Sequence, residues 1–295
     1  MQIRGVVANV GARILWGGAA YYFSLSSATD ARSLFVFRLF SAFIFALLVC
    51  ICIRQGGRLA RSLIDRRVML ISIFSSFLIS SNWFVVVRSV IDGQLVVSSL
   101  GFYIAPILTV CCGIVFLGER FNSLVALSLA LCAMAIALLF HHASSFPWQV
   151  LYIAGTSTAY AYVRKLRPLP AVVTNTIETG IAALFAPIIF LTLTKGAWRL
   201  DPNGDTLIYL AGLGVVTTVP MLLYVYSLDK IPLALIGYLQ YVTPTLMIAI
   251  GALILHETVS PIRVFAIALI WASIVSWILS QQWLPRGTLN RQEAR

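Results

Sequence analysis

The stretch that decides the fold runs from Ser98 to Glu119 and reads SSLGFYIAPILTVCCGIVFLGE, an apolar segment with an internal proline and a Gly-Glu pair near its end. A second stretch, Ile236 to Glu257, reads IGYLQYVTPTLMIAIGALILHE and repeats the pattern 138 residues further along. Among the identities that fall in register are Tyr103 with Tyr241, Pro106 with Pro244, Gly113 with Gly251, and Glu119 with Glu257. These identities predict an internal repeat.

The composition around these stretches is that of a membrane protein. Of 295 residues, 60% are hydrophobic and 11% are charged, and the mean hydropathy is +0.94. Charged residues make up about 25% of a soluble protein, and a span needs about 20 apolar residues. We therefore predict an all-α polytopic membrane protein with ten transmembrane helices, at residues 5–26, 33–53, 68–88, 95–117, 123–140, 148–163, 171–194, 206–227, 233–255 and 262–281. No small-residue cleavage site follows the first segment, which is expected to be retained.

The basic residues predict the orientation. With the N-terminus in the cytoplasm, fourteen of the 21 Lys and Arg residues lie on the cytoplasmic side and five on the outer side. Cytoplasmic loops are enriched in Lys and Arg, so both termini are expected in the cytoplasm, with the multi-pass chain in the bacterial inner membrane. This distribution explains the net charge of +11 without a nucleic-acid partner.

Each half of the chain has an odd number of spans, five, so the second half would cross the membrane upside down. We expect a first repeat at residues 1–145, an inverted second repeat at 146–281 and a cytoplasmic tail at 282–295. Inverted repeats are common in transporters, which bind substrate near the midplane and work by alternating access. Channels and membrane enzymes can also carry repeats.

Short motifs follow one another through both halves: Trp16-Gly17, Arg38, Asn82-Trp83, SLGFYIAP and FLGERF in the first, and Val163-Arg164-Lys165, Ile177-Glu178-Thr179, VVTTVP and GYLQYVTPTLM in the second. With these motifs the chain resembles the EamA branch of the drug/metabolite transporter superfamily, and within it the RarD-like proteins. The resemblance implies a secondary transporter, usually an exporter of small metabolites, amino acids or amphiphilic drugs. The chain departs from the RarD-like pattern at Arg13, Arg32-Ser33, Arg88, Val97 and Ala105. Taken together, these changes remove negative charge and add positive charge.

Three ionisable residues lie inside the predicted spans and away from their ends: Arg13, Arg38 and Glu178. Such groups are costly in hydrocarbon and usually face a bundle interior or an aqueous cavity. At about 1.5 Å per residue, Arg13 lies roughly 12 Å and Glu178 roughly 9 Å from the inner surface, whereas Arg38 lies roughly 8 Å from the outer one. We therefore expect Glu178 to approach Arg13. The pair could be purely structural; alternatively, Glu178 couples transport to protons, because unpaired burial favours a protonated carboxyl group.

Arg38 and Arg88 would make the outer half of the cavity electropositive. Because guanidinium groups bind carboxylates through two hydrogen bonds, we expect a carboxylate-bearing substrate, such as an amino acid, an opine or an opine-like metallophore. The alternative for Arg88 is a side chain that reaches the membrane interface. Trp16 and Asn82 are further candidates for substrate contact.

The repeated stretches supply candidates for movement. Pro106 and Pro244 free backbone carbonyls, so each is a candidate hinge, the alternative being an ordinary kink. Tyr103, Gln240 and Tyr241 need polar partners, which either a water-filled cavity or a neighbouring helix supplies; we expect the cavity. Glu119 and Glu257 are expected to be structural, at the N-terminus of the following helix.

Other functions lack the residues that they need. No G-x-x-x-x-G-K-[ST] loop is present, so ATP-driven pumping is not expected. The chain has three histidines, His141, His142 and His256, and the adjacent pair His141-His142 is a poor metal site without carboxylates or cysteines nearby. We therefore expect no metal and no cofactor. A membrane enzyme acting on lipids would need clustered carboxylates or histidines at one membrane face, so we expect no enzyme. Export of amphiphilic drugs, a flippase-like subunit and a homodimer stay open.

Overall fold

The computed structural model describes residues 2–24, 31–91, 95–140, 148–166, 169–194, 204–253 and 260–282, which contain helices and no strand. The helices are α1 (Ile3–Ser24), α2 (Ala31–Cys52), α3 (Gly56–Ile64), α4 (Arg66–Ile91), α5 (Leu95–Leu117), α6 (Ser123–Phe140), α7 (Trp148–Leu166), α8 (Ala171–Thr194), α9 (Gly204–Leu228), α10 (Leu233–Leu239), α11 (Val242–Leu253) and α12 (Pro261–Gln282). The all-α prediction is confirmed.

The helices have the length and composition of membrane spans. Five described stretches are long and apolar enough to cross a bilayer: Phe35–Cys52, Arg66–Val86, Ala171–Ile188, Ala211–Leu228 and Leu233–Ile250. Shorter apolar stretches occur in α5, α6 and α12. Large apolar side chains also remain exposed on the outside of the bundle, as expected where lipid takes the place of water. The chain is a polytopic membrane protein, and the number of ten spans stays a prediction.

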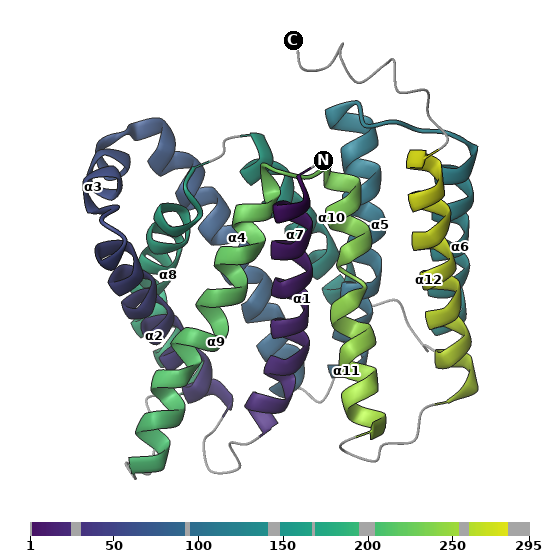
Figure 1. Cartoon of the computed structure of the whole chain (residues 1–295). Helices are drawn as coiled ribbons and strands as arrows, with labels where there is room; N and C mark the ends of the chain where they lie inside the picture. The colour runs from purple at the N-terminus through teal and green to yellow at the C-terminus, as the bar shows by residue number, and fades with distance from the viewer. Residues whose placement is uncertain are drawn as a thin grey trace.

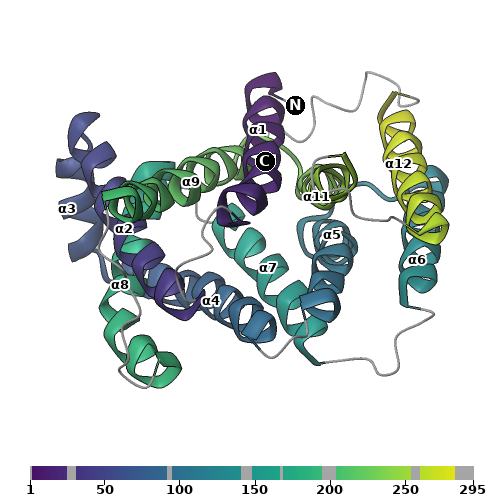
Figure 2. The ribbon, with the colours of Figure 1, turned by 90° about the horizontal axis from the view of Figure 1, so that it is seen from below.

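The helices form a bundle whose two sides differ (Figures 1 and 2). Seen along the bundle in Figure 2, α6 and α12 stand together at one side and α2, α4, α8 and α9 at the other, with α1, α5, α7 and α11 between them. The packing agrees with this view, because α6 contacts α12, α2 contacts α8 and α9, and α5 contacts α7 and α10.

The predicted span at residues 233–255 is broken into α10 and α11. Pro244 lacks an amide hydrogen, and its ring clashes with the carbonyl group four residues earlier, that of Gln240. Gln240 and Tyr241 form a turn at this point, and α11 begins at Val242. By contrast, α5 continues through Pro106 to Leu117. A helix break therefore accompanies one of the two prolines, and the role of both as hinges stays a prediction.

The end of α5 is joined to the start of α10 by Glu119. Gly118 has a φ of +63°, and the Glu119 N–H donates to the Gly113 carbonyl at 3.0 Å, the arrangement of a glycine-terminated helix. The Glu119 carboxylate accepts hydrogen bonds from the N–H groups of Leu233 and Ala234 at 2.5 and 2.8 Å. The prediction that Glu119 stabilises the following helix is wrong, because the turn at Gly118 directs the carboxylate to α10.

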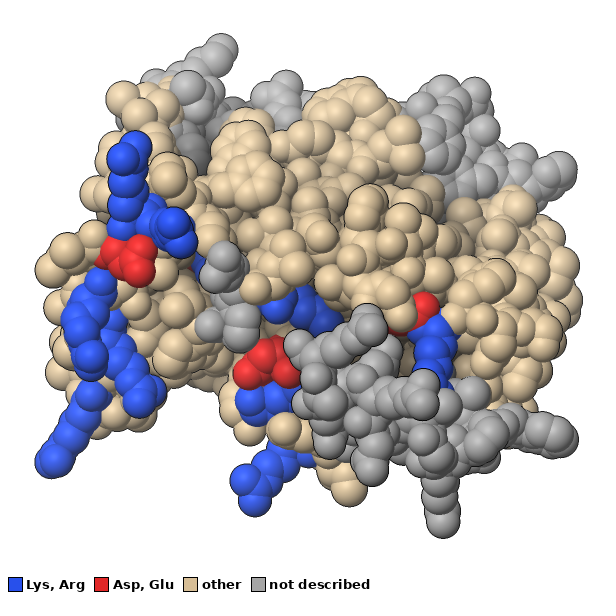
Figure 3. Space-filling view, turned by 90° about the horizontal axis from the view of Figure 1, so that it is seen from above, with Lys and Arg blue, Asp and Glu red and all other residues tan. Residues whose placement is uncertain are grey.

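The face of the bundle that bears the N-terminus also carries a group of basic side chains (Figure 3). Arg54, Arg58, Arg61, Arg66 and Arg67 are all exposed around α3. On the same face, Lys165 at the end of α7 donates hydrogen bonds to the carbonyls of Leu228 and Ile231 at 3.0 and 2.6 Å. The cytoplasmic assignment of this face stays a prediction.

Candidate functional site

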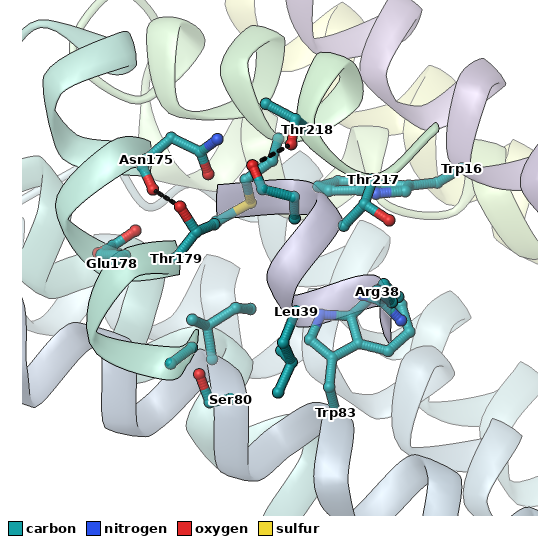
Figure 4. A pocket seen from close by; sticks show the side chains of 14 residues that line it. Trp16, Arg38, Leu39, Ser80, Trp83, Asn175, Glu178, Thr179, Thr217 and Thr218 are labelled. Atoms are coloured by element: carbon teal, nitrogen blue, oxygen red, sulfur yellow. Dashed lines mark hydrogen bonds between the residues drawn. The ribbon is translucent and has the colours of Figure 1, made fainter. Parts of the chain in front are cut away.

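A pocket lies among α1, α2, α4, α8 and α9, with an empty volume of about 600 Å³ that includes space open to solvent (Figure 4). Two tryptophans, five small polar residues and two charged residues line it together with aliphatic side chains. The lining residues are Trp16, Arg38, Leu39, Ala42, Ile79, Ser80, Trp83, Asn175, Glu178, Thr179, Ala182, Thr217, Thr218 and Met221. Helices from both halves of the sequence therefore build one site, which contains the predicted residues Trp16, Arg38 and Glu178.

Arg38 supplies the positive charge of this pocket. Its guanidinium carbon lies 3.9 Å from the centre of the Trp83 ring, a cation–π contact between α2 and α4. Arg38 is 9% exposed, and its buried Nε finds no hydrogen-bond partner in the ranges that the structure describes. Within the described part of the chain, Arg38 forms no ion pair and donates no side-chain hydrogen bond. The tryptophan covers one face of the guanidinium group and leaves its donors unused.

Two further polar groups that line the pocket are unpaired. The Asn175 Nδ2 on α8 and the Thr217 Oγ1 on α9 are buried and have no hydrogen-bond partner among the described residues. Figure 4 shows both side chains around the same space as Arg38. An unpaired buried polar group costs about 1–3 kcal/mol, so a bound molecule that pairs with these groups would be stabilised. Of the three groups, Arg38 Nε and Asn175 Nδ2 can only donate hydrogen bonds, which favours a ligand rich in acceptors.

Glu178 faces the pocket from α8, but its charge is already balanced. Its Oε1 accepts a hydrogen bond from Arg164 Nε at 2.6 Å, and the two side chains form an ion pair. Ser75 donates to the same oxygen, and Tyr160 donates to Oε2 at 2.8 Å. Glu178 and Arg164 are 2% and 3% exposed. A buried carboxylate is stable only with such partners.

The expected pair between Glu178 and Arg13 is therefore wrong. Arg13 lies on α1 with its guanidinium carbon 4.7 Å from the ring centre of Tyr224 and 5.1 Å from that of Trp16. Its Nε donates to Asn9 Oδ1 at 3.4 Å. The depth of a residue along a helix does not determine the direction in which its side chain points. In addition, Arg164 lies beyond the predicted span that ends at residue 163, so it is not among the predicted partners. In the structure α7 extends to Leu166, and Arg164 is directed into the bundle.

The Glu178–Arg164 ion pair lies between two cavities. Glu178 lines the central pocket, whereas Arg164 lines a smaller one together with Thr174 and Asp229. In the smaller cavity the Arg164 Nη1 and the Thr174 Oγ1 are buried without a partner. The pair therefore separates the central pocket from a polar cavity next to the loop that follows α9.

Other predicted site residues hold helices together. Asn82 on α4 donates to the carbonyl of Ile153 and to Thr156 Oγ1, both at 2.8 Å. It is 3% exposed and does not line the central pocket. In this arrangement its amide stabilises the contact between α4 and α7.

Tyr103, Gln240 and Tyr241 lie where α5 meets the break between α10 and α11. The Tyr241 hydroxyl donates to the Tyr103 carbonyl at 3.0 Å, and Gln240 Nε2 donates to Thr109 Oγ1 at 3.4 Å. Tyr241 is 1% exposed and Gln240 9% exposed. The prediction that these polar groups reach a water-filled cavity is wrong for Gln240 and Tyr241, because the neighbouring helix supplies their partners.

Some predictions fall outside the described residues. Arg88 belongs to α4, but its side chain is not among those described. The side chain of Arg32 is likewise not described. All three histidines, Glu257 and the tail after Gln282 lie outside the described residues. Among the described cysteines, all five are free, and Cys50, Cys112 and Cys132 are buried.

Comparisons with known proteins identify the family. Residues 147–279 match the model of the EamA-like transporter family. The uncharacterized transporter YojE of Bacillus subtilis is 31% identical over 283 residues, which cover 94% of each chain. This chain belongs to the EamA-like transporter family. Protein RarD of Escherichia coli is similar to it as well, with 27% identity over 292 residues and 97% of each chain covered.

A solved crystal structure has the same fold as this EamA-like protein. The two agree with a TM-score of 0.73 over 92% of this chain and 96% of the other, at 16% identity. The uncharacterized transporter PA0485 of Pseudomonas aeruginosa is a further relative, 30% identical over 280 residues and 92% of each chain. The chain is accordingly a bacterial membrane transporter, and its RarD-like character is confirmed.

Sequence reasoning missed several residues of the candidate site, namely Ser75, Arg164, Asn175 and Thr217, and it did not assign Tyr160 to Glu178. Signals for some of them were present. Tyr160 and Arg164 are four residues apart and share a helix face, as do Ser72, Ser75 and Ser76 on α4. Arg164 and Glu178 also lie in two of the motifs that carry the family resemblance. No sequence signal distinguished Asn175 or Thr217 from other polar residues in spans.

Proposed function

We propose that this transporter exports a small carboxylate-bearing metabolite across the inner membrane and that Arg38 binds the carboxylate in the central pocket. The observation that carries the proposal is the unpaired Arg38. Among the residues lining the pocket, Glu178 is the single carboxylate, and Arg164 already neutralises it. The pocket therefore has an excess positive charge, which a substrate anion would balance.

The rest of the pocket suits the organic part of such a solute. Trp16 and Trp83 present aromatic surfaces, and Ile79 and Met221 add aliphatic ones. Asn175 and Thr217 offer hydrogen bonds to oxygen atoms beyond the carboxylate. Amino acids, opines and opine-like metallophores combine these features, and Arg88 would add positive charge on the outer side. A cationic amphiphilic drug is less favoured, because it would meet the charge of Arg38.

We further propose alternating access between two inverted repeats, residues 1–145 and 146–281. The pairing of α2 with α8, of α6 with α12 and of α5 with α10 fits repeats related by a two-fold axis. In this proposal the described conformation is closed toward the N-terminal face. The hydrogen bonds of Glu119 and Lys165 and the Glu178–Arg164 pair would have to rearrange before the pocket opened there. Proton coupling through Glu178 loses its support, since that argument needed an unpaired carboxyl group.

Counterflow into proteoliposomes tests the proposal. The full chain is reconstituted, vesicles are loaded with unlabelled solute, and uptake of labelled carboxylates is compared with uptake of labelled cationic amphiphiles. We expect saturable uptake of at least one carboxylate, with little uptake by vesicles that contain the Arg38→Gln protein. Uptake of the cations alone, unchanged in Arg38→Gln, would contradict the proposal. Comparison of the medium of cells with and without the gene would then identify the exported metabolite.

A further inference from the structure

Helix α3 differs from the other helices of the bundle. None of its nine residues, Gly56–Ile64, is buried. Leu63 and Ile64 are 51% and 85% exposed, and with Leu59 and Ala60 they occupy one side of the helix. Arg58, Arg61 and Ser62 occupy the other side, since residues three and four apart share a face. The helix is therefore amphipathic, and the described protein buries none of its residues, although Leu59 and Ser62 are partly covered.

The charge around α3 is strongly positive and uncompensated. Between residues 54 and 67 there are five arginines and one acidic residue, Asp65. Asp65 Oδ1 accepts hydrogen bonds from the N–H groups of Arg67 and Val68 at 2.9 and 3.2 Å and so caps α4. As far as the chain is described, the five arginines form no ion pair. The segment thus presents a net charge of +4 at the surface (Figure 3).

The position of α3 places both features at the edge of the apolar bundle. It follows α2, where Ile51 is 59% exposed, and Ile53 directly after α2 is 49% exposed; α4 comes next, and its Leu70 is 57% exposed. Exposed apolar residues therefore precede and follow α3 along the chain. A helix at such a boundary buries its apolar side among acyl chains while its basic residues reach the headgroups.

We propose that α3 and its flanking arginines form a binding surface for anionic phospholipid headgroups, with α3 lying in the plane of the membrane interface. An anionic leaflet supplies both partners that the segment lacks: acyl chains for Leu63 and Ile64, and phosphate groups for the arginines. Arg side chains bind phosphate through two hydrogen bonds. This surface is separate from the central pocket, so the inference does not depend on the transported substrate.

Native mass spectrometry of the full-length protein in detergent tests this surface. The protein is mixed with equal amounts of phosphatidylglycerol and phosphatidylcholine, and the retained lipids are counted. We expect the wild-type protein to retain more phosphatidylglycerol than phosphatidylcholine. The variant Arg58→Gln/Arg61→Gln should lose affinity for phosphatidylglycerol by about fivefold per arginine, since each basic residue contributes about 1 kcal/mol at an anionic surface. Arg4→Gln/Arg120→Gln is the matched control, because it removes the same charge away from α3, and it should keep the preference.

A second measurement uses the unmodified protein. Hydrogen exchange of residues 56–64 is followed in nanodiscs of phosphatidylcholine alone and of phosphatidylcholine with 30% phosphatidylglycerol, a composition chosen near that of anionic membranes. We expect slower exchange in the anionic nanodiscs. Identical exchange in the two kinds of nanodisc would overturn the proposal. In the mass-spectrometry experiment, two results would overturn it: equal retention of phosphatidylglycerol by Arg58→Gln/Arg61→Gln and wild type, or an equal loss of phosphatidylglycerol affinity in this variant and in the Arg4→Gln/Arg120→Gln control.

Discussion

Arg164 donates a hydrogen bond from Nε to Oε1 of Glu178 at 2.6 Å, and both side chains are almost fully buried. This pairing determines the electrostatics of the candidate site. Because it neutralises Glu178, the charge of Arg38 across the pocket is left without a counter-ion. The same pair joins the lining of the central pocket, to which Glu178 belongs, to that of the smaller cavity near Asp229, to which Arg164 belongs. Four predictions follow from these contacts and from the packing of α5 against α10.

Arg38→Lys and Arg38→Gln should affect carboxylate transport in a graded manner. Lysine keeps the charge but not the planar pair of donors, whereas glutamine removes the charge. We expect an intermediate rate for Lys and a loss of about tenfold or more for Gln, since a charge-assisted hydrogen bond contributes about 1.5–3 kcal/mol. Initial rates of counterflow measure the effect. Arg120→Gln, on the N-terminal face, should transport at the wild-type rate; equal rates in all four proteins would exclude a role for Arg38.

Arg164→Gln should destabilise the protein strongly. It leaves the Glu178 carboxylate buried with hydroxyl partners alone, and removal of one partner of a buried ion pair costs about 3–5 kcal/mol. Thermal unfolding in detergent should show a lower midpoint. The double variant Arg164→Met/Glu178→Leu removes both charges and should unfold at a higher temperature than Arg164→Gln. If the double variant were the less stable of the two, the cost would not come from the unpaired charge.

Gly237→Ala should weaken the contact between α10 and α5. A Cβ atom at this position would lie 2.8 Å from the Pro106 carbonyl oxygen and 2.9 Å from Val110 Cγ2. Overpacking of this kind costs about 1–3 kcal/mol. Gly18→Ala is the matched control, because nothing lies within 4 Å of a Cβ at that helical position. The unfolding midpoint should fall for Gly237→Ala only, and equal midpoints would show that the contact between α5 and α10 accommodates the added methyl group without cost.

Glu119→Ala should release the start of α10 from the end of α5. The substitution removes both acceptors of the Leu233 and Ala234 N–H groups, whereas Glu119→Gln keeps one acceptor without the charge. Hydrogen exchange at these two amides should be fastest in Glu119→Ala and intermediate in Glu119→Gln. Amides in the middle of α12 serve as an internal reference. Unchanged exchange at Leu233 and Ala234 would mean that the carboxylate does not protect them.

The positions of the predicted apolar segments agree closely with the helices. Each predicted span coincides with one helix, or with α10 and α11 for residues 233–255. The agreement arises because a bilayer requires long apolar segments with internally satisfied backbone groups, so hydropathy alone locates them. Motifs also identified the family. The break at Gln240 and Tyr241 was foreseeable from Pro244, although the unbroken α5 shows that a proline does not by itself break a helix.

The sequence by itself determined which residues enter the membrane and that Arg13, Arg38 and Glu178 needed special environments there. Only the tertiary structure decided their partners. Glu178 pairs with Arg164, Arg13 stacks on Tyr224 and Trp16, and Arg38 stays unpaired beside Trp83. The physical reason is that hydropathy and residue counting define position along the bundle axis. The rotation of each helix and the packing of its neighbours, to which both halves of the chain contribute, define which side chains meet.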